Sequence, residues 1–346
     1  MNKLIKLVAS ILILFSVLLG SDQRIKTLGG NAMYWPGDDS NIELFPQLIN
    51  DYNIAQISGI NSSDSLHGKL IWGDKTKYGF SWKEDDKHNL LNFYMGTGSM
   101  GLRLGLLSEE KEAGDDKESE LGLSGSIGAQ NDNLDIGLHA STYSTNDGTS
   151  NDQYHEFNSD LFFRMGMDAW IFNNLAASMH YKSDNGNPDN ALDYQRTWLE
   201  MNLGFFNTIQ ISDNAIAMLA LSTSYLSLNN YEGSDVSVER IQLPNFTFGV
   251  EGKITDWAKA RIGLNKNYTL TLKANEPGES TVGLRQGEDL AKAFGLGFNY
   301  GAFNLDLYVT EALFTNPVQH IIGFENLEPD SGPNGGAVSA TVTYSW

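Results

Sequence analysis

The sequence predicts an all-β fold, a transmembrane antiparallel β-barrel of about sixteen strands, with fourteen as the alternative count. Three observations predict it. Apolar residues alternate with polar residues or glycine along most of the chain, short turns alternate with long polar segments, and an apolar leader precedes the first strand. Strands with one apolar face and unequal connections at their two ends are typical of a closed barrel that crosses a membrane. A soluble sandwich has no reason to keep its long loops at one end.

The composition excludes several other classes. The chain has 346 residues, of which 43 are acidic and 23 basic, with no cysteine and a net charge of −20. Without cysteine it cannot be a disulfide scaffold or a cysteine-based metal protein. The strong negative charge argues against a nucleic-acid partner. We expect neither a cofactor nor a metal site.

The first residues are predicted to be a signal peptide. Lys3 and Lys6 precede an apolar run at Leu7–Leu19, and the small residues Gly20 and Ser21 follow where a peptidase could cut. No later apolar run reaches the length of a spanning helix. The expected organisation is a signal peptide at 1–21, an N-terminal periplasmic or lumen-filling segment at 22–52 and the barrel at 53–346.

Two-residue alternation locates the strands. In the last of them Val338, Ala340, Val342 and Tyr344 share one face, and small hydroxyl residues share the other. The same pattern recurs at 121–128, 134–141, 163–170, 258–265, 294–300 and 303–309. Predicted strand cores begin at Asn53, Leu66, Lys77, Asn89, Ser99, Ser119, Asn133, Ser159, Leu175, Thr197, Ala215, Val236, Asp256, Asp289, Ala302 and Ala337.

The connections alternate in length, with long external loops and short periplasmic turns as the expected arrangement. Short turns are predicted near Asn131–Asp132, Asn173, Ile211–Asp213, Lys253–Thr255 and Gly301. Long loops are predicted at Ser108–Lys117, Ser144–Glu156, Ser183–Tyr194, Asn229–Ser234, Lys266–Gln286 and Glu311–Gly336.

The segment before the first strand predicts a short helix at Ile42–Tyr52. Ser40 would be its N-cap, Glu43 would lie in its first turn, and Pro46 would bend it. Such a helix could line or fill the lumen, or the segment could be a periplasmic tail.

Two segments carry a resemblance to known families. The terminal Tyr344-Ser345-Trp346 resembles the C-terminal signal of Gram-negative outer-membrane β-barrels, with Trp where Phe is commoner. That resemblance implies an outer-membrane location, with the barrel-assembly machinery, outer-membrane lipid and lipopolysaccharide as partners. The stretch Thr27–Ala32, followed by Asp38–Asn41 and Phe45-Pro46, is similar to the entry of barrels of the long-chain fatty-acid transporter type, although Phe45 replaces an Asn of that pattern. This second resemblance implies an N-terminal segment partly filling the lumen and passage of hydrophobic compounds.

Charged residues on the presumed inner face are the predicted pore lining, because a charge facing lipid would cost ~2–4 kcal/mol for Arg or Lys. They would set the selectivity of a pore or brace the wall as internal salt bridges. Inner-face glycines such as Gly128, Gly204, Gly263 and Gly295 favour open space in the lumen. The predicted lining residues are Arg103, Asp135, Arg164, Asp168, His180, Lys182, Glu200, Glu251, Lys259, Arg261 and Asp306.

Motifs for enzymatic chemistry are weak, and we expect no enzyme. Gly96–Gly101 fits G-x-G-x-x-G, but the residues after it alternate as a strand instead of opening the helix that dinucleotide binding needs. His139 and Ser141 are similar to the His and Ser of outer-membrane phospholipase, yet they read as a polar pair on the inner wall. Loop acids could attract cations or simply be solvated, namely Glu109, Glu110, Glu112, Asp115, Asp116, Glu118 and Glu120.

These observations predict an outer-membrane channel, a porin for passive diffusion of small hydrophilic solutes or ions. The alternative is an outer-membrane transporter of hydrophobic compounds with an N-terminal hatch. A structural or enzymatic barrel has less support, and the oligomeric state, monomer or homo-oligomer, stays open.

Overall fold

The computed structural model describes residues 21–60, 66–83, 91–113, 116–146, 153–169, 171–187, 194–231, 236–276, 279–280, 283–285, 290–309 and 338–346. Almost all of the predicted signal peptide and the predicted loop at 311–336 therefore lie outside the described residues. Among the described residues, no helix is long and apolar enough to cross a membrane.

The helical elements all precede the first strand. They are α2 (Asp22–Thr27) and the 3-10 helices η1 (Ala32–Tyr34), η2 (Asp39–Glu43) and η3 (Pro46–Asp51). The strands are β1 (Ile54–Ile60), β2 (His67–Gly73), β3 (Thr76–Lys83), β4 (Leu91–Thr97), β5 (Met100–Ala113), β6 (Asp116–Asn131), β7 (Leu134–Asn146), β8 (Gln153–Ala169), β9 (Phe172–Asn187), β10 (Tyr194–Ser212), β11 (Ala215–Tyr231), β12 (Val236–Thr255), β13 (Ala258–Lys266), β14 (Thr269–Glu276), β15 (Glu279–Ser280), β16 (Gly283–Arg285), β17 (Ala291–Tyr300), β18 (Phe303–Val309) and β19 (Val338–Ser345).

The strands close into one antiparallel barrel of sixteen positions, which confirms the predicted fold class and the higher of the two counts. Each strand pairs with its sequence neighbours, and β19 closes the ring on β1, with Ile54 opposite Ser345. Two of the sixteen strand positions around the ring are each made of more than one strand. β13 and β14 succeed one another along β12, and β15, β16 and β17 together form the next position.

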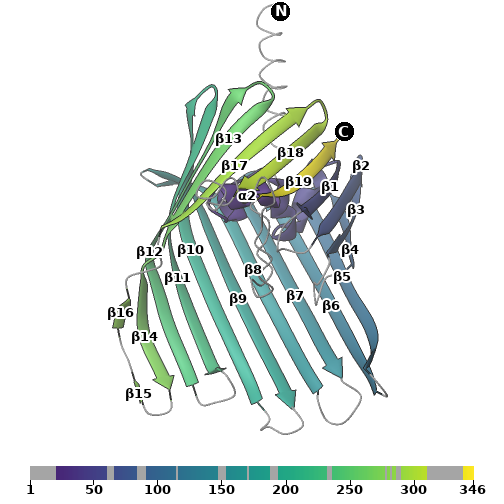
Figure 1. Ribbon diagram of the computed structural model, residues 1–346, viewed down its shortest axis with the longest axis vertical. Coiled ribbons are helices and arrows are strands. Elements are labelled where there is room, and N and C mark those ends of the chain that lie inside the picture. Colours follow the sequence, from purple (N-terminus) through teal and green to yellow (C-terminus); the bar gives the residue numbers. More distant parts are fainter. Residues whose placement is uncertain are drawn as a thin grey trace, which may run out of the picture.

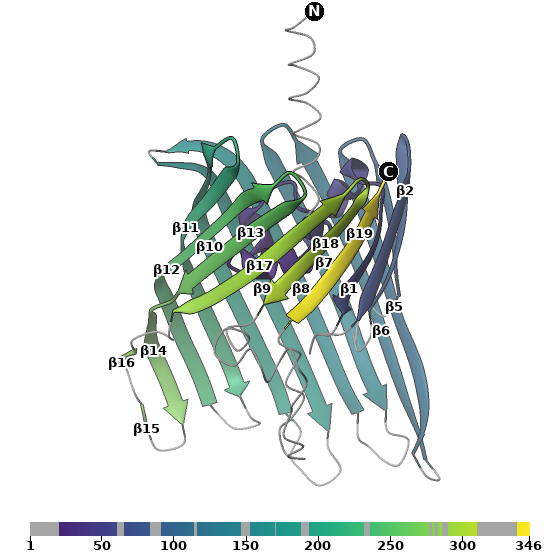
Figure 2. The same ribbon diagram turned by 45° about the horizontal axis from the view of Figure 1, so that its top comes forward.

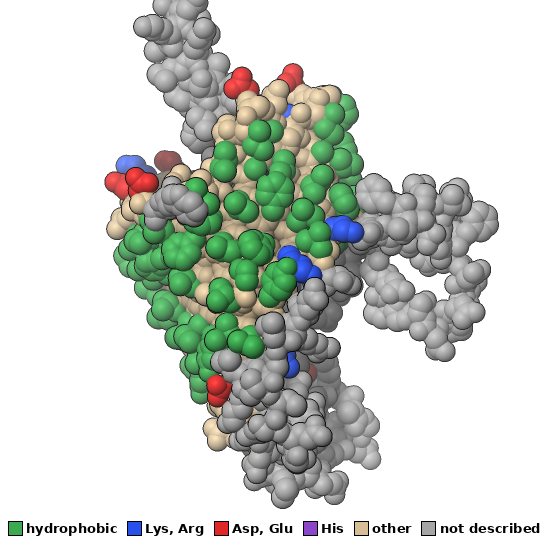
Figure 3. Space-filling view, turned by 90° about the vertical axis from the view of Figure 1, so that its left-hand side faces the viewer, with side chains coloured by type: hydrophobic (Ala, Val, Ile, Leu, Met, Phe, Trp, Pro, Cys, Tyr) green, Lys and Arg blue, Asp and Glu red, His purple; other side chains and the backbone are tan. Residues whose placement is uncertain are grey.

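The outer face of the wall is apolar, as the alternation predicts. In β19 the side chains of Val342 and Tyr344 are exposed outward while Thr341 and Thr343 are buried inward. Figure 3 shows hydrophobic side chains spread over most of one outer face, with the visible Asp and Glu side chains at its edges. Exposed outward apolar residues occur around the ring, among them Phe93, Leu104, Leu123, Leu138, Leu161, Met201, Leu219, Phe248 and Ile262.

The connections at one end of the barrel are two-residue turns, at the end where the C-terminus lies (Figure 1). The predicted turns near Asn131, Asn173, Asp213, Thr255 and Gly301 fall within a few residues of turns there. The predicted long loops at the other end are partly wrong. Ser108–Lys117 is mostly the continuation of β5 and β6, and Lys266–Gln286 contains β14, β15 and β16. Alternation fades in those polar segments, but backbone pairing with a neighbouring strand continues.

The wall is taller on one side than on the other. Strands β5 to β12 have 13 to 20 residues, whereas β1 to β4, β18 and β19 have 7 or 8. Figures 1 and 2 show the long strands extending well beyond the short ones, away from the end that carries the C-terminus.

The N-terminal segment lies inside the ring near that same end (Figure 2). We call residues 22–52 the plug. The apolar core of the protein is mostly built from it, because Ile42, Phe45 and Ile49 are fully buried and pack with inward-facing Phe206 and Met218 of the wall.

The predicted helix at Ile42–Tyr52 is wrong. The segment forms two 3-10 helices, η2 and η3, instead of one α-helix. Asp38, not Ser40, is the N-cap of η2, and its carboxylate accepts the hydrogen bond from the Ser40 backbone nitrogen. Pro46 begins η3 instead of bending a helix, because proline has no N–H to donate and suits a first helical position.

Candidate functional site

A buried charge cluster joins the first helix of the plug to β12, β13 and β18. The guanidinium of Arg24 in α2 donates to Glu251 at 2.9 Å and to Asp38 at 2.5 Å. Glu251 also accepts from Arg261 at 2.6 Å, and Arg261 donates to Asp306 at 2.6 Å. Removing one partner of a buried ion pair costs roughly 3–5 kcal/mol, because the other charge is left in a dry environment. The cluster therefore holds α2 firmly against the wall.

A second cluster surrounds Glu43 at the end of η2. Its carboxylate accepts hydrogen bonds from Arg103 at 2.6 Å and from the Tyr94 hydroxyl at 2.8 Å, and Lys69 lies 3.3 Å away. Burial by itself would raise the pKa of Glu43, but the charges of Lys69 and Arg103 outweigh it and lower the pKa below its usual range. Glu43 is thus an anion held by β2, β4 and β5.

Arg164 of β8 forms a third attachment. Its guanidinium binds the Asp135 carboxylate of β7 at 2.7 Å and donates to the Asn41 side chain at 3.1 Å. It also lies over the Phe45 ring, 4.8 Å from the ring centroid. One arginine therefore connects the wall to both a polar and an aromatic residue of the plug.

Asp39 is a buried acid with a different environment. Its side chain is fully buried, Oδ2 accepts from Gln56 at 2.7 Å, and Oδ1 has no hydrogen-bond partner among the described residues. Burial raises the pKa of Asp39 well above its usual range, and the adjacent charge of Asp38 raises it further. Asp38 has Arg24 and Ser40 as partners. Asp39 is therefore the acid of this pair that keeps its proton to the higher pH.

The inner-face glycines accommodate the plug, so the expectation that they mark open space is wrong. A Cβ on Gly101 would lie 2.3 Å from the backbone of Pro46 and Gln47, and one on Gly263 would lie 2.4 Å from the backbone nitrogen of Gly29. At Gly128, Gly204 and Gly295 an added Cβ would instead meet the plug side chains of Gln47, Tyr34 and Thr27. The absence of side chains at these positions allows the plug backbone to approach the wall closely.

The structure brings most of the predicted lining residues into ion pairs. Arg103, Asp135, Arg164, Glu251, Lys259, Arg261 and Asp306 belong to the clusters described above or border them. His180 pairs with Asp160, and Lys182 binds Glu156 at 2.6 Å, nearer the long-strand end. Glu200 accepts a hydrogen bond from Asn202, and Asp168 is exposed near the β8–β9 turn. Sequence reasoning missed the plug partners Arg24 and Glu43, because nothing local pairs them with the wall.

His139 is a structural residue of the wall. Its Nε2 donates to the Leu44 carbonyl oxygen at 2.8 Å, and Nδ1 lies 3.0 Å from both the Ser126 hydroxyl and Arg103. Its hydroxyl neighbour is thus Ser126 and not the predicted Ser141, which accepts from Asn158 at 3.4 Å. In the described part of the chain no group of three His, Asp or Glu side chains could hold a metal ion. The side chains of most of the predicted acidic loop at 109–120 lie outside the described residues.

Exposed aromatic residues form a band along part of the short-turn end, from the β12–β13 turn through β17, β18 and β19 to β3, a feature that the sequence reasoning missed. Trp72 and Tyr78 flank the β2–β3 turn, with ring centroids 6.4 Å apart. Tyr344 contacts Phe303 at 4.8 Å and Trp346 at 5.7 Å, centroid to centroid. Trp257 and Tyr300 lie at two further turns of that end. The predicted assembly signal, Tyr344 and Trp346, is therefore part of this aromatic band.

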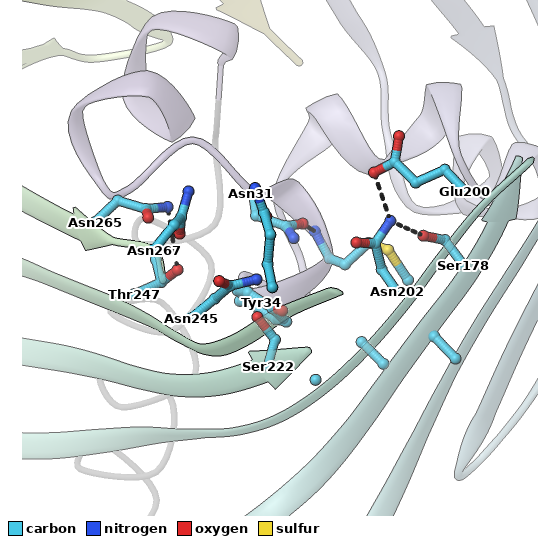
Figure 4. Close-up of a pocket in the computed structure, with 15 residues that line it drawn as sticks. Asn31, Tyr34, Ser178, Glu200, Asn202, Ser222, Asn245, Thr247, Asn265 and Asn267 are labelled. Atoms are coloured by element: carbon cyan, nitrogen blue, oxygen red, sulfur yellow. Dashed lines mark hydrogen bonds between the residues drawn. The ribbon is translucent and has the colours of Figure 1, made fainter. Parts of the chain in front are cut away.

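A polar cavity lies between the plug and strands β9 to β13, with a volume of about 270 Å³. Figure 4 shows Asn31 and Tyr34 of the plug between two groups of wall residues, Asn265, Asn267 and Thr247 on one side and Glu200, Asn202 and Ser178 on the other. Amide side chains dominate the lining, namely Asn31, Asn202, Gln242, Asn245, Asn265 and Asn267. Glu200 is the one ionisable carboxylate in this lining. The cavity can accept and donate many hydrogen bonds but carries little charge.

No protein-family model and no curated protein sequence match this chain. The solved structures that the chain resembles include outer-membrane proteins. The siderophore receptor PirA from Acinetobacter baumannii is 11% identical with a TM-score of 0.41, over 74% of this chain and 52% of PirA. The Pseudomonas putida toluene transporter TodX is 9% identical with a TM-score of 0.40, over 95% and 98%. OmpT, an outer membrane protein of Vibrio cholerae, is 8% identical with a TM-score of 0.34, over 85% and 97%. The chain thus spans about half the length of PirA.

Proposed function

We propose that this protein is an outer-membrane channel for small hydrophilic solutes, in which residues 22–52 form a movable plug. The observation that supports this proposal most directly is how the plug is held inside the ring. Side-chain ion pairs connect it to the wall, Arg24 with Glu251 and Glu43 with Arg103. The plug forms no strand in the wall. Because these contacts join side chains and not paired backbone strands, breaking them lets the plug shift while the sheet stays closed.

The outer surface supports a location in a membrane. An apolar belt with an aromatic band at one edge is what a lipid-facing barrel needs, because aromatic side chains favour the interface between lipid and water. Short turns face the periplasm in outer-membrane barrels, so we infer that the short-turn end faces the periplasm and the taller wall faces outward.

The inner surface supports hydrophilic cargo. The cavity beside the plug is lined mainly by amides and hydroxyls, which an apolar solute would leave without hydrogen bonds. The second candidate, a transporter of hydrophobic compounds with an N-terminal hatch, is favoured by the plug itself but not by this lining.

A reversible tether between plug and wall tests whether the plug moves. The sequence has no native cysteine, so only the introduced cysteines can react. Ser339 of β19 donates to Gln23 of α2 at 2.9 Å, so in the double variant Gln23→Cys with Ser339→Cys a short bifunctional methanethiosulfonate reagent can join plug and wall through disulfides that reduction cleaves. The control, Ser58→Cys with Thr341→Cys, joins two wall strands whose hydroxyls are 3.0 Å apart. The barrel is reconstituted in liposomes, and entry of arabinose is measured by swelling before and after reduction.

The plug tether should slow arabinose entry at least tenfold, with recovery on reduction, while the wall tether should change it less than twofold. Equal entry through the tethered and reduced forms would overturn the movable plug. Toluene uptake without arabinose entry in the untethered protein would favour the second candidate instead.

A further inference from the structure

The cavity of about 270 Å³ lies on the outer-loop side of the plug. Along β10 the inward residues run from Phe206, which contacts the Tyr34 ring, through Gly204 to Asn202 and Glu200. The residues nearer the β9–β10 connection thus line the cavity, and the plug forms its floor. A solute entering from the taller side of the barrel would meet this cavity before the plug.

An irregularity in β12 builds the cavity. Gln242 and Asn245 are three residues apart, and regular alternation would point them to opposite faces of the sheet. Ser222 pairs with Asn245 and Ser224 with Gln242, so two residues of β12 stand opposite Thr223. This bulge turns both amides inward, and both line the cavity. Bulges commonly redirect a side chain in this way next to functional sites.

Besides the cavity itself, the buried side chain of Asn245 points to a ligand. Its side chain is only 8% exposed, and its Oδ1 atom is buried with no hydrogen-bond partner among the described residues. A buried acceptor without a donor costs about 1–3 kcal/mol. Asn245 also lines the cavity, so a small turn of its side chain would bring Oδ1 to a hydroxyl donor bound there.

We propose that this cavity binds a neutral polyhydroxylated solute, such as a monosaccharide or disaccharide unit. The inference rests on the proposed function, of which it names the solute class. Amide and hydroxyl groups donate and accept at once, which matches sugar hydroxyls. Glu200 disfavours an anion, and a single carboxylate among neutral amides and hydroxyls is fewer charged oxygens than a divalent-cation site gathers. The volume is close to the lower end of small-molecule sites, which are about 300–1,000 Å³.

Isothermal titration of the detergent-solubilised full chain with sucrose measures binding separately from transport. Asn245→Leu should weaken sucrose binding about tenfold, as expected for one or two lost hydrogen bonds. Asn92→Leu is the matched control. Asn92 is equally buried on the inner face of β4, eight strands away across the ring from β12. It should change sucrose binding less than twofold.

Gluconate tests the charge argument, because it has sugar-like hydroxyls and one carboxylate. It should bind at least tenfold more weakly than sucrose, and Glu200→Gln should narrow that difference without weakening sucrose binding. Asn245→Leu should keep the heat-modifiable mobility of the folded barrel, which shows that any loss of binding is local.

The outcomes separate the two proposals. Arabinose entry into liposomes without sucrose binding would overturn the sugar site and leave the channel intact. Sucrose binding without arabinose entry would overturn the channel and leave the site. Equal loss of binding in Asn245→Leu and Asn92→Leu, or tighter binding of gluconate than of sucrose, would also overturn the sugar site.

Discussion

At the scale of single residues, the plug has two acids, Glu43 and Asp39, whose ionisation has opposite effects on how tightly the plug docks. The pKa of Glu43 is lowered by Lys69 and Arg103, so its contribution to docking is present above its ordinary pKa and is lost as the pH falls through the lowered value. The pKa of Asp39 is raised, so its contribution is full below its ordinary pKa and is lost as the pH rises through the raised value.

We therefore predict that alkaline conditions loosen the plug. As Asp39 ionises beside Asp38, two buried negative charges share a site in which Lys69 is a nearby cation and Asp22 adds repulsion. Single-channel conductance should rise with pH, and Asp39→Asn should remove that rise. The control Asp256→Asn, in an exposed turn, should keep it. A pH response that is unchanged in Asp39→Asn would contradict the prediction.

At the scale of elements, η3 fits closely against the wall because the inner-face residues opposite it include glycines, which have no side chain to obstruct it. Its 3-10 form follows from Pro46 at the first position and from the short span between Phe45 and the first strand. The neighbouring β5 and β6 offer Gly101 and Gly128, where any Cβ would meet the plug. The element and its groove are therefore matched in shape.

One added methyl group should disturb this fit. Gly101→Ala places a carbon 2.3 Å from the plug backbone, which cannot move aside as a flexible side chain could. We expect the plug to be displaced and conductance to rise several-fold, with the barrel still folded. At Gly125 of β6 the nearest atom to an added Cβ is 4.0 Å away, so Gly125→Ala should behave as the parent protein. Equal conductance in the two variants would show that η3 does not obstruct the passage.

The last strand is the second element with a direct test. β19 pairs with both β1 and β18 and so closes the ring, and the backbone nitrogen of Trp346 donates to the Asn53 carbonyl oxygen at 3.3 Å. Deleting Tyr344–Trp346 should prevent insertion into the outer membrane, whereas Trp346→Phe should preserve it. Folded, heat-modifiable protein in normal amounts after the deletion would contradict this.

At the scale of the whole molecule, charge is distributed in two populations. The wall charges are largely paired with one another or with the plug, whereas the chain as a whole carries −20. Exposed loop charge acts over about 8 Å at physiological salt. Its influence should therefore be confined to the approach of ions to the mouth.

This distribution predicts weak cation selectivity that fades as the salt concentration rises. Reversal potentials across a KCl gradient, measured at low and high ionic strength, provide the test. Anion preference at low salt, or strong selectivity that survives high salt, would mean that unpaired charges in the lumen dominate.

The sequence by itself determined the barrel and, where alternation is regular, which face of a strand looks outward, and it left the strand count at sixteen or fourteen. Alternation is a local property of the extended backbone, so Ala215 and Val236 begin β11 and β12 as predicted. Prediction from this alternation failed at β14, where polar residues occupy both faces. It also failed in the plug, where proline and glycine interrupt the spacing of apolar residues. Only the closed ring decided that Arg24 meets Glu251, 227 residues away, and that Gly101 faces Pro46. Such contacts depend on strand register and on which wall residues face the plug across the lumen, and neither is encoded in the spacing of neighbouring residues.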